Sequence, residues 1–109
     1  MQLSTEVFGE VAVAHAPQEI GEAHVDALKL AFQSVPRASI VLDLEGTELL
    51  DSAGLELLLD LQDALRDRGG ELKLATSNHV NRKILEVTRL DREFEVFDAV
   101  IDAVKSFHR

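Results

Sequence analysis

The residues best suited to chemistry lie in one turn, Asp51-Ser52-Ala53-Gly54, between a short apolar run and a leucine-rich stretch. A serine hydroxyl can be a nucleophile, but no histidine or lysine lies near Ser52 in the sequence to activate it, which argues against a hydrolase. A helix that starts here leaves backbone N–H groups unpaired and carries about half a positive charge, so it could stabilise a phosphate. The simpler alternative is that Asp51 is only an N-cap and Ser52 a small first helical residue.

Other groups that could do chemistry lack the spacing that it requires. The histidines do not show the i, i+4 spacing of a metal site on one helix, so we expect structural or solvent roles for His15, His24, His79 and His108. Gly69-Gly70 lacks the phosphate-loop pattern and suits a helix C-cap. Nothing in the sequence brings Asp43 and Asp51 to one reacting atom. We therefore expect no catalytic residue, no metal and no cofactor.

Length and composition limit the classes of protein that the chain can be. Its 109 residues suit a single domain, residues 1–109, with one hydrophobic core. The absence of cysteine excludes thiol catalysis and disulfides. No apolar run approaches the roughly 20 residues that span a bilayer, so we expect a cytoplasmic protein without membrane insertion. The net charge of −9 disfavours direct nucleic-acid binding and favours a partner with a basic face, unless the acidity serves only solubility.

The segment from residue 38 to residue 74 predicts a strand, a helix and a second strand. Ile40–Leu44 is a short apolar run, typical of a strand buried in a parallel sheet. The helix begins at Asp51-Ser52 and ends at Gly69-Gly70, where a left-handed C-cap is expected. Glu71–Ala75 then predicts the next strand. The chemically suggestive turn thus lies at the carboxyl end of the first strand.

This helix carries an apolar stripe centred on Leu58. Leu57 and Leu59 lie about 100° to either side of that direction, too far round for both to be fully buried against one sheet. One of them could face a partner. The alternative is that neighbouring helices cover these flanks.

The N-terminal residues predict an edge ribbon followed by a helix. Leu3–Phe8 and Val11–Ala14 alternate weakly around Gly9-Glu10, which favours two antiparallel strands. Pro17 suits the first turn of a helix whose apolar positions run through Val25–Val35.

The C-terminal third predicts a helix, a short strand and a last helix. Thr76-Ser77-Asn78 offers an N-cap for a helix that ends near Arg89. Phe94–Phe97 alternates as a short strand does, and Asp98 would cap the last helix. Together the elements predict a small α/β domain, with a mixed sheet of four to five strands and about four helices.

The run LDLEGTELLDSAGLELL, residues 42–58, followed by RGGELKLA, resembles the STAS domain family, whose best-known members are bacterial anti-sigma factor antagonists. The similarity continues through Val80–Leu85, residues 88–91, Phe94 and the last helix, and it implies the same α/β fold. The chain departs from the family at residues 15–18, His-Ala-Pro-Gln, where a glycine and an aspartate are usual. It also has Arg89 where the family commonly has glycine, and a left-handed arginine would cost about 1 kcal/mol.

In anti-sigma factor antagonists the serine of this turn is the phosphoacceptor of a kinase that is also the anti-sigma factor, and that serine maps onto Ser52. The resemblance therefore implies a non-enzymatic module that binds an anti-sigma factor serine kinase while Ser52 is unmodified, frees a sigma factor and is reset by a phosphatase. The alternatives are a STAS subunit of a membrane transport or sensory assembly, acting as a docking module, and an enzyme such as a small nucleotide hydrolase.

The predicted partner surface is the loop Glu45–Leu50 with the first two turns of the helix, Asp51–Leu59. Acidic residues cluster here without a basic residue before Arg66, and they should attract a basic patch: Asp43, Glu45, Glu48, Asp51, Glu56 and Asp60. The predicted partner-binding residues are Glu48, Asp51, Ala53, Gly54, Leu55, Glu56 and Leu59.

Overall fold

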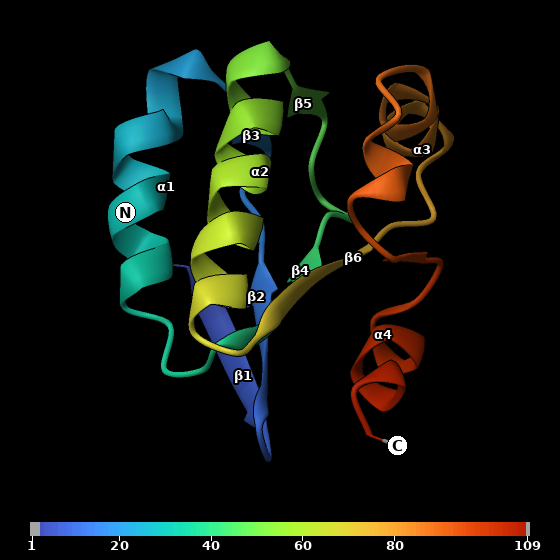
Figure 1. Cartoon of the computed structure of the whole chain (residues 1–109). Helices are drawn as coiled ribbons and strands as arrows, with labels where there is room; N and C mark the ends of the chain where they lie inside the picture. The colour runs from blue at the N-terminus through green and yellow to red at the C-terminus, as the bar shows by residue number, and fades with distance from the viewer. Residues whose placement is uncertain (1–2, 109) are drawn as a thin grey trace.

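A mixed five-stranded sheet forms the centre of the computed structural model, which describes residues 3–108 (Figure 1). Its order is β1-β2-β4-β6-β7, and only β1 runs antiparallel to its neighbour. The strands are β1 (Ser4–Phe8), β2 (Val11–His15), β4 (Ser39–Asp43), β6 (Glu71–Ala75) and β7 (Val96–Phe97). The α/β class, the mixed sheet and the N-terminal antiparallel ribbon are confirmed.

Helices cover both faces of this sheet. The helices α1 (Val25–Gln33) and α2 (Ser52–Asp67) lie side by side over one face (Figure 1). There they bury the larger core, whose sheet residues include Ala12, Ile40, Leu42, Leu72 and Leu74. The helix α4 (Val100–Ser106) covers Val11, Val13, Val41 and Ala75 on the other face. Residues 3–108 also contain α3 (His79–Val87) and two 3-10 turns, η1 (Glu22–His24) and η2 (Leu90–Arg92).

A buried lysine helps to hold α4 against the sheet. The Nζ atom of Lys73 donates a 2.8 Å hydrogen bond to the Oγ of Ser106 and lies 4.1 Å from the ring centroid of Phe107. It also lies 3.4 Å from a carboxylate oxygen of Glu95. These groups replace the water that the ammonium ion loses on burial, because hydroxyl, carboxylate and ring face all attract a cation.

The segment around Pro17 is extended, so the prediction that Pro17 opens a helix is wrong. Two short strands, β3 (Glu19–Ile20) and β5 (Leu49–Leu50), pair in parallel as a second sheet. The carbonyl of Pro17 accepts a 2.8 Å hydrogen bond from Thr47 Oγ1, and that of Gln18 accepts from the N–H of residue 48. These distant partners fix the extended backbone, and the helical turns begin only at η1.

The predicted helix ends agree with the structure in α2 and α3. After α2, Gly69 takes a φ of 80°, and the N–H of Gly70 donates to the carbonyl of Leu65, as in a glycine C-cap. Asn78 caps α3 through its side-chain oxygen. Arg89 takes a φ of 62° where the family commonly has glycine, so the left-handed conformation is kept at the arginine.

Two C-terminal predictions are corrected. Ala99, and not Asp98, is the N-cap of α4, because the Asp98 carboxylate instead pairs with the guanidinium of Arg82 at 2.9 Å. The predicted strand over residues 94–97 is limited to β7, since Phe94 is buried in the core and precedes it.

Candidate functional site

The first turn of α2 is held by the carboxylate of Asp51. One oxygen accepts a 2.9 Å hydrogen bond from the N–H of Gly54, and the other accepts a 3.1 Å bond from the N–H of Glu22. These bonds lower the pKa of the Asp51 carboxyl below its ordinary value of 3.8, and the bond from Gly54 has the largest effect. Asp51 is therefore a charged anchor between two segments and a poor proton acceptor for catalysis.

Two glycines allow the start of α2 to lie directly against β3. A Cβ added at Gly54 would lie 2.1 Å from the carbonyl oxygen of Ile20, and one added at Gly21 would lie 2.7 Å from a carboxylate oxygen of Asp51. No side chain fits either space without moving its neighbours. Gly54 is thus required by the close approach of a backbone carbonyl, which gives this part of the motif a structural reason.

Polar contacts tie the loop of residues 45–50 to its surroundings. Thr47 is fully buried, and the Nδ2 of Asn81 donates a 2.9 Å hydrogen bond to its carbonyl. Glu45 accepts hydrogen bonds from the backbone N–H and the hydroxyl of Ser77. Glu48 accepts a 2.7 Å bond from the side chain of Gln18. The loop is therefore a fixed platform between β3 and the start of α3.

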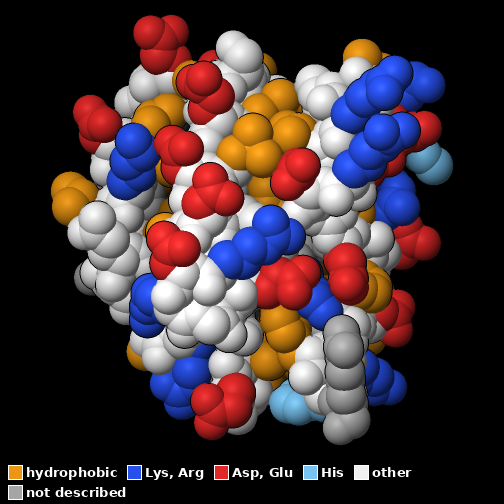
Figure 2. Space-filling view, viewed as in Figure 1, with side chains coloured by type: hydrophobic (Ala, Val, Ile, Leu, Met, Phe, Trp, Pro, Cys, Tyr) orange, Lys and Arg blue, Asp and Glu red, His pale blue; other side chains and the backbone are white. Residues whose placement is uncertain are grey.

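The predicted partner-binding residues divide into an exposed and a buried group. Ser52, Glu48 and Glu56 are exposed, while Asp51, Ala53 and Leu59 are half-buried. Gly54 and Leu55 are buried in the domain, so they support the surface from below. Leu57 is buried in the same core cluster as Phe32 of α1, which leaves Leu59 as the flank nearer to solvent. Figure 2 shows acidic side chains along α2.

Ser52 is the first residue of α2, and its side chain makes no hydrogen bond within residues 3–108. The N–H groups of Gly54 and Leu55 already donate to the side chain and the carbonyl of Asp51. The positive end of the helix dipole lies at this first residue of α2. The position can accommodate a negative group, and the hydroxyl is open to a modifying enzyme.

A charged cluster lies where β2 and β4 end. The ring nitrogens of His15 lie 2.8 Å from a carboxylate oxygen of Glu6 and 2.7 Å from one of Asp43. Since both partners accept, only the doubly protonated ring can donate to both. The hydrogen bond with Glu6, which has the largest effect, and the hydrogen bond with Asp43 raise the pKa of His15 above its ordinary value of 6.5. Asp43 also accepts a 3.0 Å hydrogen bond from the N–H of Glu45, which couples this cluster to the start of the loop.

The described residues do not support a metal site or a membrane-spanning helix. Across residues 3–108, no three carboxylate or imidazole side chains are arranged to hold a metal ion. No helix between residues 3 and 108 has both the length and the apolar character needed to cross a membrane.

Sequence reasoning missed the residues that support the site from a distance. These are Gln18, Gly21, Glu22, Thr47 and Asn81, whose partners lie about 30 positions away in the chain. The departure from the family at residues 15–18 was a signal that this region differs, but it did not predict the pairing of β3 with β5.

Comparisons with known proteins agree with this architecture. The model of the STAS domain matches residues 2–103. A protein of Thermotoga maritima assigned as an anti-sigma factor antagonist is 27% identical over 70 residues, which are 64% of this chain. The match spans 62% of that relative's own length.

Solved structures share the fold over nearly the whole chain. An anti-sigma factor antagonist from Mycobacterium paratuberculosis has 25% identity and a TM-score of 0.84, covering 96% of this chain and 92% of its own. A structure from Thermotoga maritima, assigned to the same class, has 20% identity and a TM-score of 0.88, covering 98% and 95%. The phosphorylated form of SpoIIAA, a Bacillus cell fate determinant, has 20% identity and a TM-score of 0.69, covering 97% and 99%.

Proposed function

The chain belongs to the STAS domain family, and we propose that it is an anti-sigma factor antagonist switched by phosphorylation of Ser52. Unmodified, it binds a serine kinase that is also an anti-sigma factor, and so frees a sigma factor for transcription. The observation that carries this proposal is the exposed serine at the first position of α2, in the middle of an acidic surface. Its relatives of the same class supply the functional context.

The binding surface in this proposal is the loop of residues 45–50 with the first two turns of α2. The exposed acids Glu48 and Glu56 lie in it with Leu49, of which 46% is exposed. Opposite charges at the rim of an interface accelerate association, and a partly exposed leucine gives apolar area to bury. The partner should therefore present a basic face around an apolar centre.

Phosphorylation of Ser52 would weaken partner binding without unfolding the domain. The phosphate adds about −1.5 to −2 charge, which the positive end of the helix dipole at the start of α2 can stabilise. When the partner docks, this phosphate must lose its water while it lies among the acids of the surface, and like-charge juxtaposition at an interface costs several kcal/mol. A loss of about 3 kcal/mol reduces affinity more than about a hundredfold.

In the same proposal the chain is a binding module and not an enzyme, acts in the bacterial cytoplasm and is reset by a separate phosphatase. The hydrogen bonds of Asp51 support the non-enzymatic role, because the carboxylate next to Ser52 already accepts two of them from the backbone. It cannot serve as a general base without losing the cap of α2.

The test is to incubate the protein with a partner kinase and ATP, map the phosphosite by mass spectrometry, and measure the affinity of both forms. Ser52→Ala should bind the partner and resist release by ATP, whereas Ser52→Asp should bind weakly and melt close to the wild type. An unmodified Ser52 in the presence of a competent partner kinase would contradict the switch. Equal affinities of the two forms would favour a fixed docking module instead.

A further inference from the structure

The outer edge of β1 has no neighbouring strand among residues 3–108, because β1 is the end strand of the large sheet. Only Gly9-Glu10 connects β1 to β2, and Gly9 has a φ of 63°, which the first central position of a type II′ turn requires. In such a hairpin the closing pair, Phe8 and Val11, exchanges backbone hydrogen bonds, and bonded pairs then alternate with non-bonded pairs. The N–H and C=O groups of Thr5 and Val7 therefore point to the free edge.

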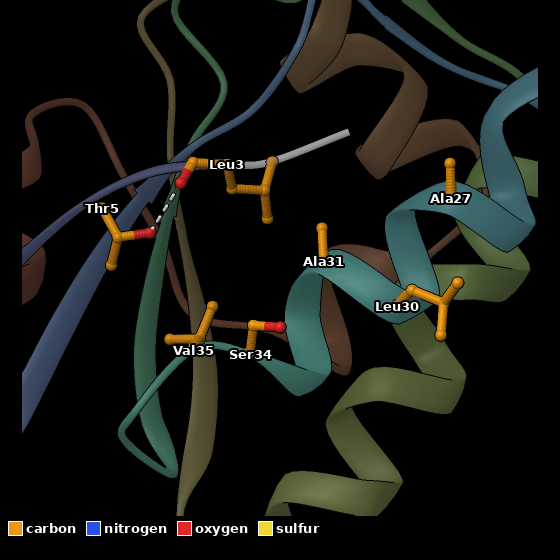
Figure 3. Close-up of a pocket in the computed structure, with 7 residues that line it drawn as sticks. All are labelled: Leu3, Thr5, Ala27, Leu30, Ala31, Ser34 and Val35. Atoms are coloured by element: carbon orange, nitrogen blue, oxygen red, sulfur yellow. Dashed lines mark hydrogen bonds between the residues drawn. The ribbon is translucent and has the colours of Figure 1, made fainter.

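A hollow of about 450 Å³ lies beside this edge, between β1 and α1 (Figure 3). Within the described chain its lining carries no charge and consists of Leu3, Thr5, Ala27, Leu30, Ala31, Ser34 and Val35. The alanines and the serine are small, which leaves space along α1. Two larger apolar side chains are open to solvent here: Leu30 is 66% exposed, and Val7, on the same face of β1 as Thr5, is 45% exposed.

We propose that a second copy of this chain binds to this edge, with the two β1 strands antiparallel about a two-fold axis at Thr5. In this register Thr5 faces the second copy's Thr5, and Leu3 faces the second copy's Val7. The outward N–H and C=O groups of the two strands then meet each other, so the two sheets become one continuous sheet. An edge that matches itself in this way suits an isologous dimer.

Charge favours the strand register with the axis at Thr5 over the register with the axis at Glu6. If Glu6 lay on the axis, its carboxylate would face the same carboxylate of the second copy, and like charges directly opposite destabilise a strand pair. With Thr5 on the axis, Glu6 faces the second copy's Ser4, whose hydroxyl can donate to it. Two copies that each carry a net charge of −9 repel one another over most of their surfaces, so the uncharged lining of the hollow is where contact is least opposed.

The same axis brings the two α1 helices together on one side of the joined sheet. The exposed Leu30 of each copy can then enter the hollow of the other, where Ala27 and Ala31 leave room. The surface at the start of α2 lies on different elements, so a dimer would present it twice.

The test is the oligomeric state of the full chain by sedimentation equilibrium at increasing protein concentration. The wild type should form dimers. Val7→Lys and Leu30→Lys should each raise the dimer dissociation constant by about tenfold or more, which is about 1.4 kcal/mol. The control is Ile101→Lys, which removes an apolar side chain that is 61% exposed on α4, over the other sheet face, and should change nothing.

A charge pair tests the register. Leu3→Glu alone should weaken the dimer, and Leu3→Glu with Val7→Lys should restore it, because each glutamate then faces the second copy's lysine. Within one strand these positions are about 13 Å apart and cannot compensate each other. A monomer at every concentration, including one that binds extended peptides, overturns the proposal. So does a dimer that Ile101→Lys dissociates while Val7→Lys does not; thermal melting confirms that each variant is folded.

Discussion

Replacing Gly54 with alanine tests whether the start of α2 depends on its close approach to β3. In an isolated helix this substitution is favourable, because alanine exceeds glycine in helix propensity by about 1 kcal/mol. In the folded domain the new Cβ would lie 2.1 Å from the carbonyl oxygen of Ile20, far short of the 3.4 Å at which ordinary contact begins. The two effects therefore have opposite signs.

The packing effect should be the larger one. Added atoms in a packed region cost about 1–3 kcal/mol and occasionally more, and the upper end applies because a backbone carbonyl cannot rotate away. Moving α2 also weakens the Asp51 cap, which is worth about 1 kcal/mol. After the gain in helix propensity is subtracted from these two costs, we expect Gly54→Ala to lower the free energy of unfolding by about 2–3 kcal/mol. For a domain of this size the melting temperature should fall by about 10 °C or more.

The assay is urea and thermal unfolding of Gly54→Ala beside Gly46→Ala. Gly46 is the matched control, because nothing lies within 4 Å of its added Cβ and its φ is not left-handed. Gly46→Ala should be neutral or stabilise the domain by about 0.4–1 kcal/mol through the unfolded chain. If Gly54→Ala melted at or above the wild type, the steric reasoning about this turn would be refuted.

Three further predictions follow from other contacts. Glu48→Lys combined with Glu56→Lys should slow association with a confirmed partner at low salt, measured by stopped flow, and an unchanged on-rate would show that the acidic surface is not the binding surface. Arg89→Gly should raise the free energy of unfolding by about 1 kcal/mol, because the backbone at this position has a φ of 62°; Arg89→Ala, measured alongside it, should show no such gain. The pKa of His15 is raised in the folded state, so its ion pairs with Glu6 and Asp43 stabilise the domain fully below the unfolded value of 6.5 and are lost as pH rises through the folded value. Urea unfolding at several pH values should therefore show stability falling as pH rises above 6.5 in the wild type, and His15→Gln should lose that dependence; an identical pH profile would count against the cluster.

Local signals in the sequence predicted the central part of the fold. The apolar run of β4, the stripe of α2 and the glycine after it each depend on residues a few positions apart, so short-range preferences are sufficient to identify them. The same holds for Asn78 as the cap of α3. The position of Ser52 at the start of α2 also follows from the local pattern of strand, turn and helix.

Only the tertiary structure decided how that turn is supported. The strands β3 and β5 are two residues long, and they exist because segments about 30 positions apart pair in parallel. Asp51 lies 29 positions along the chain from the Glu22 amide that it binds. Gly54 is similarly remote in the chain from Ile20, whose carbonyl excludes a side chain at Gly54. No local pattern contains such partners, because hydrogen bonds and steric limits between remote segments arise only when the chain has folded around its core.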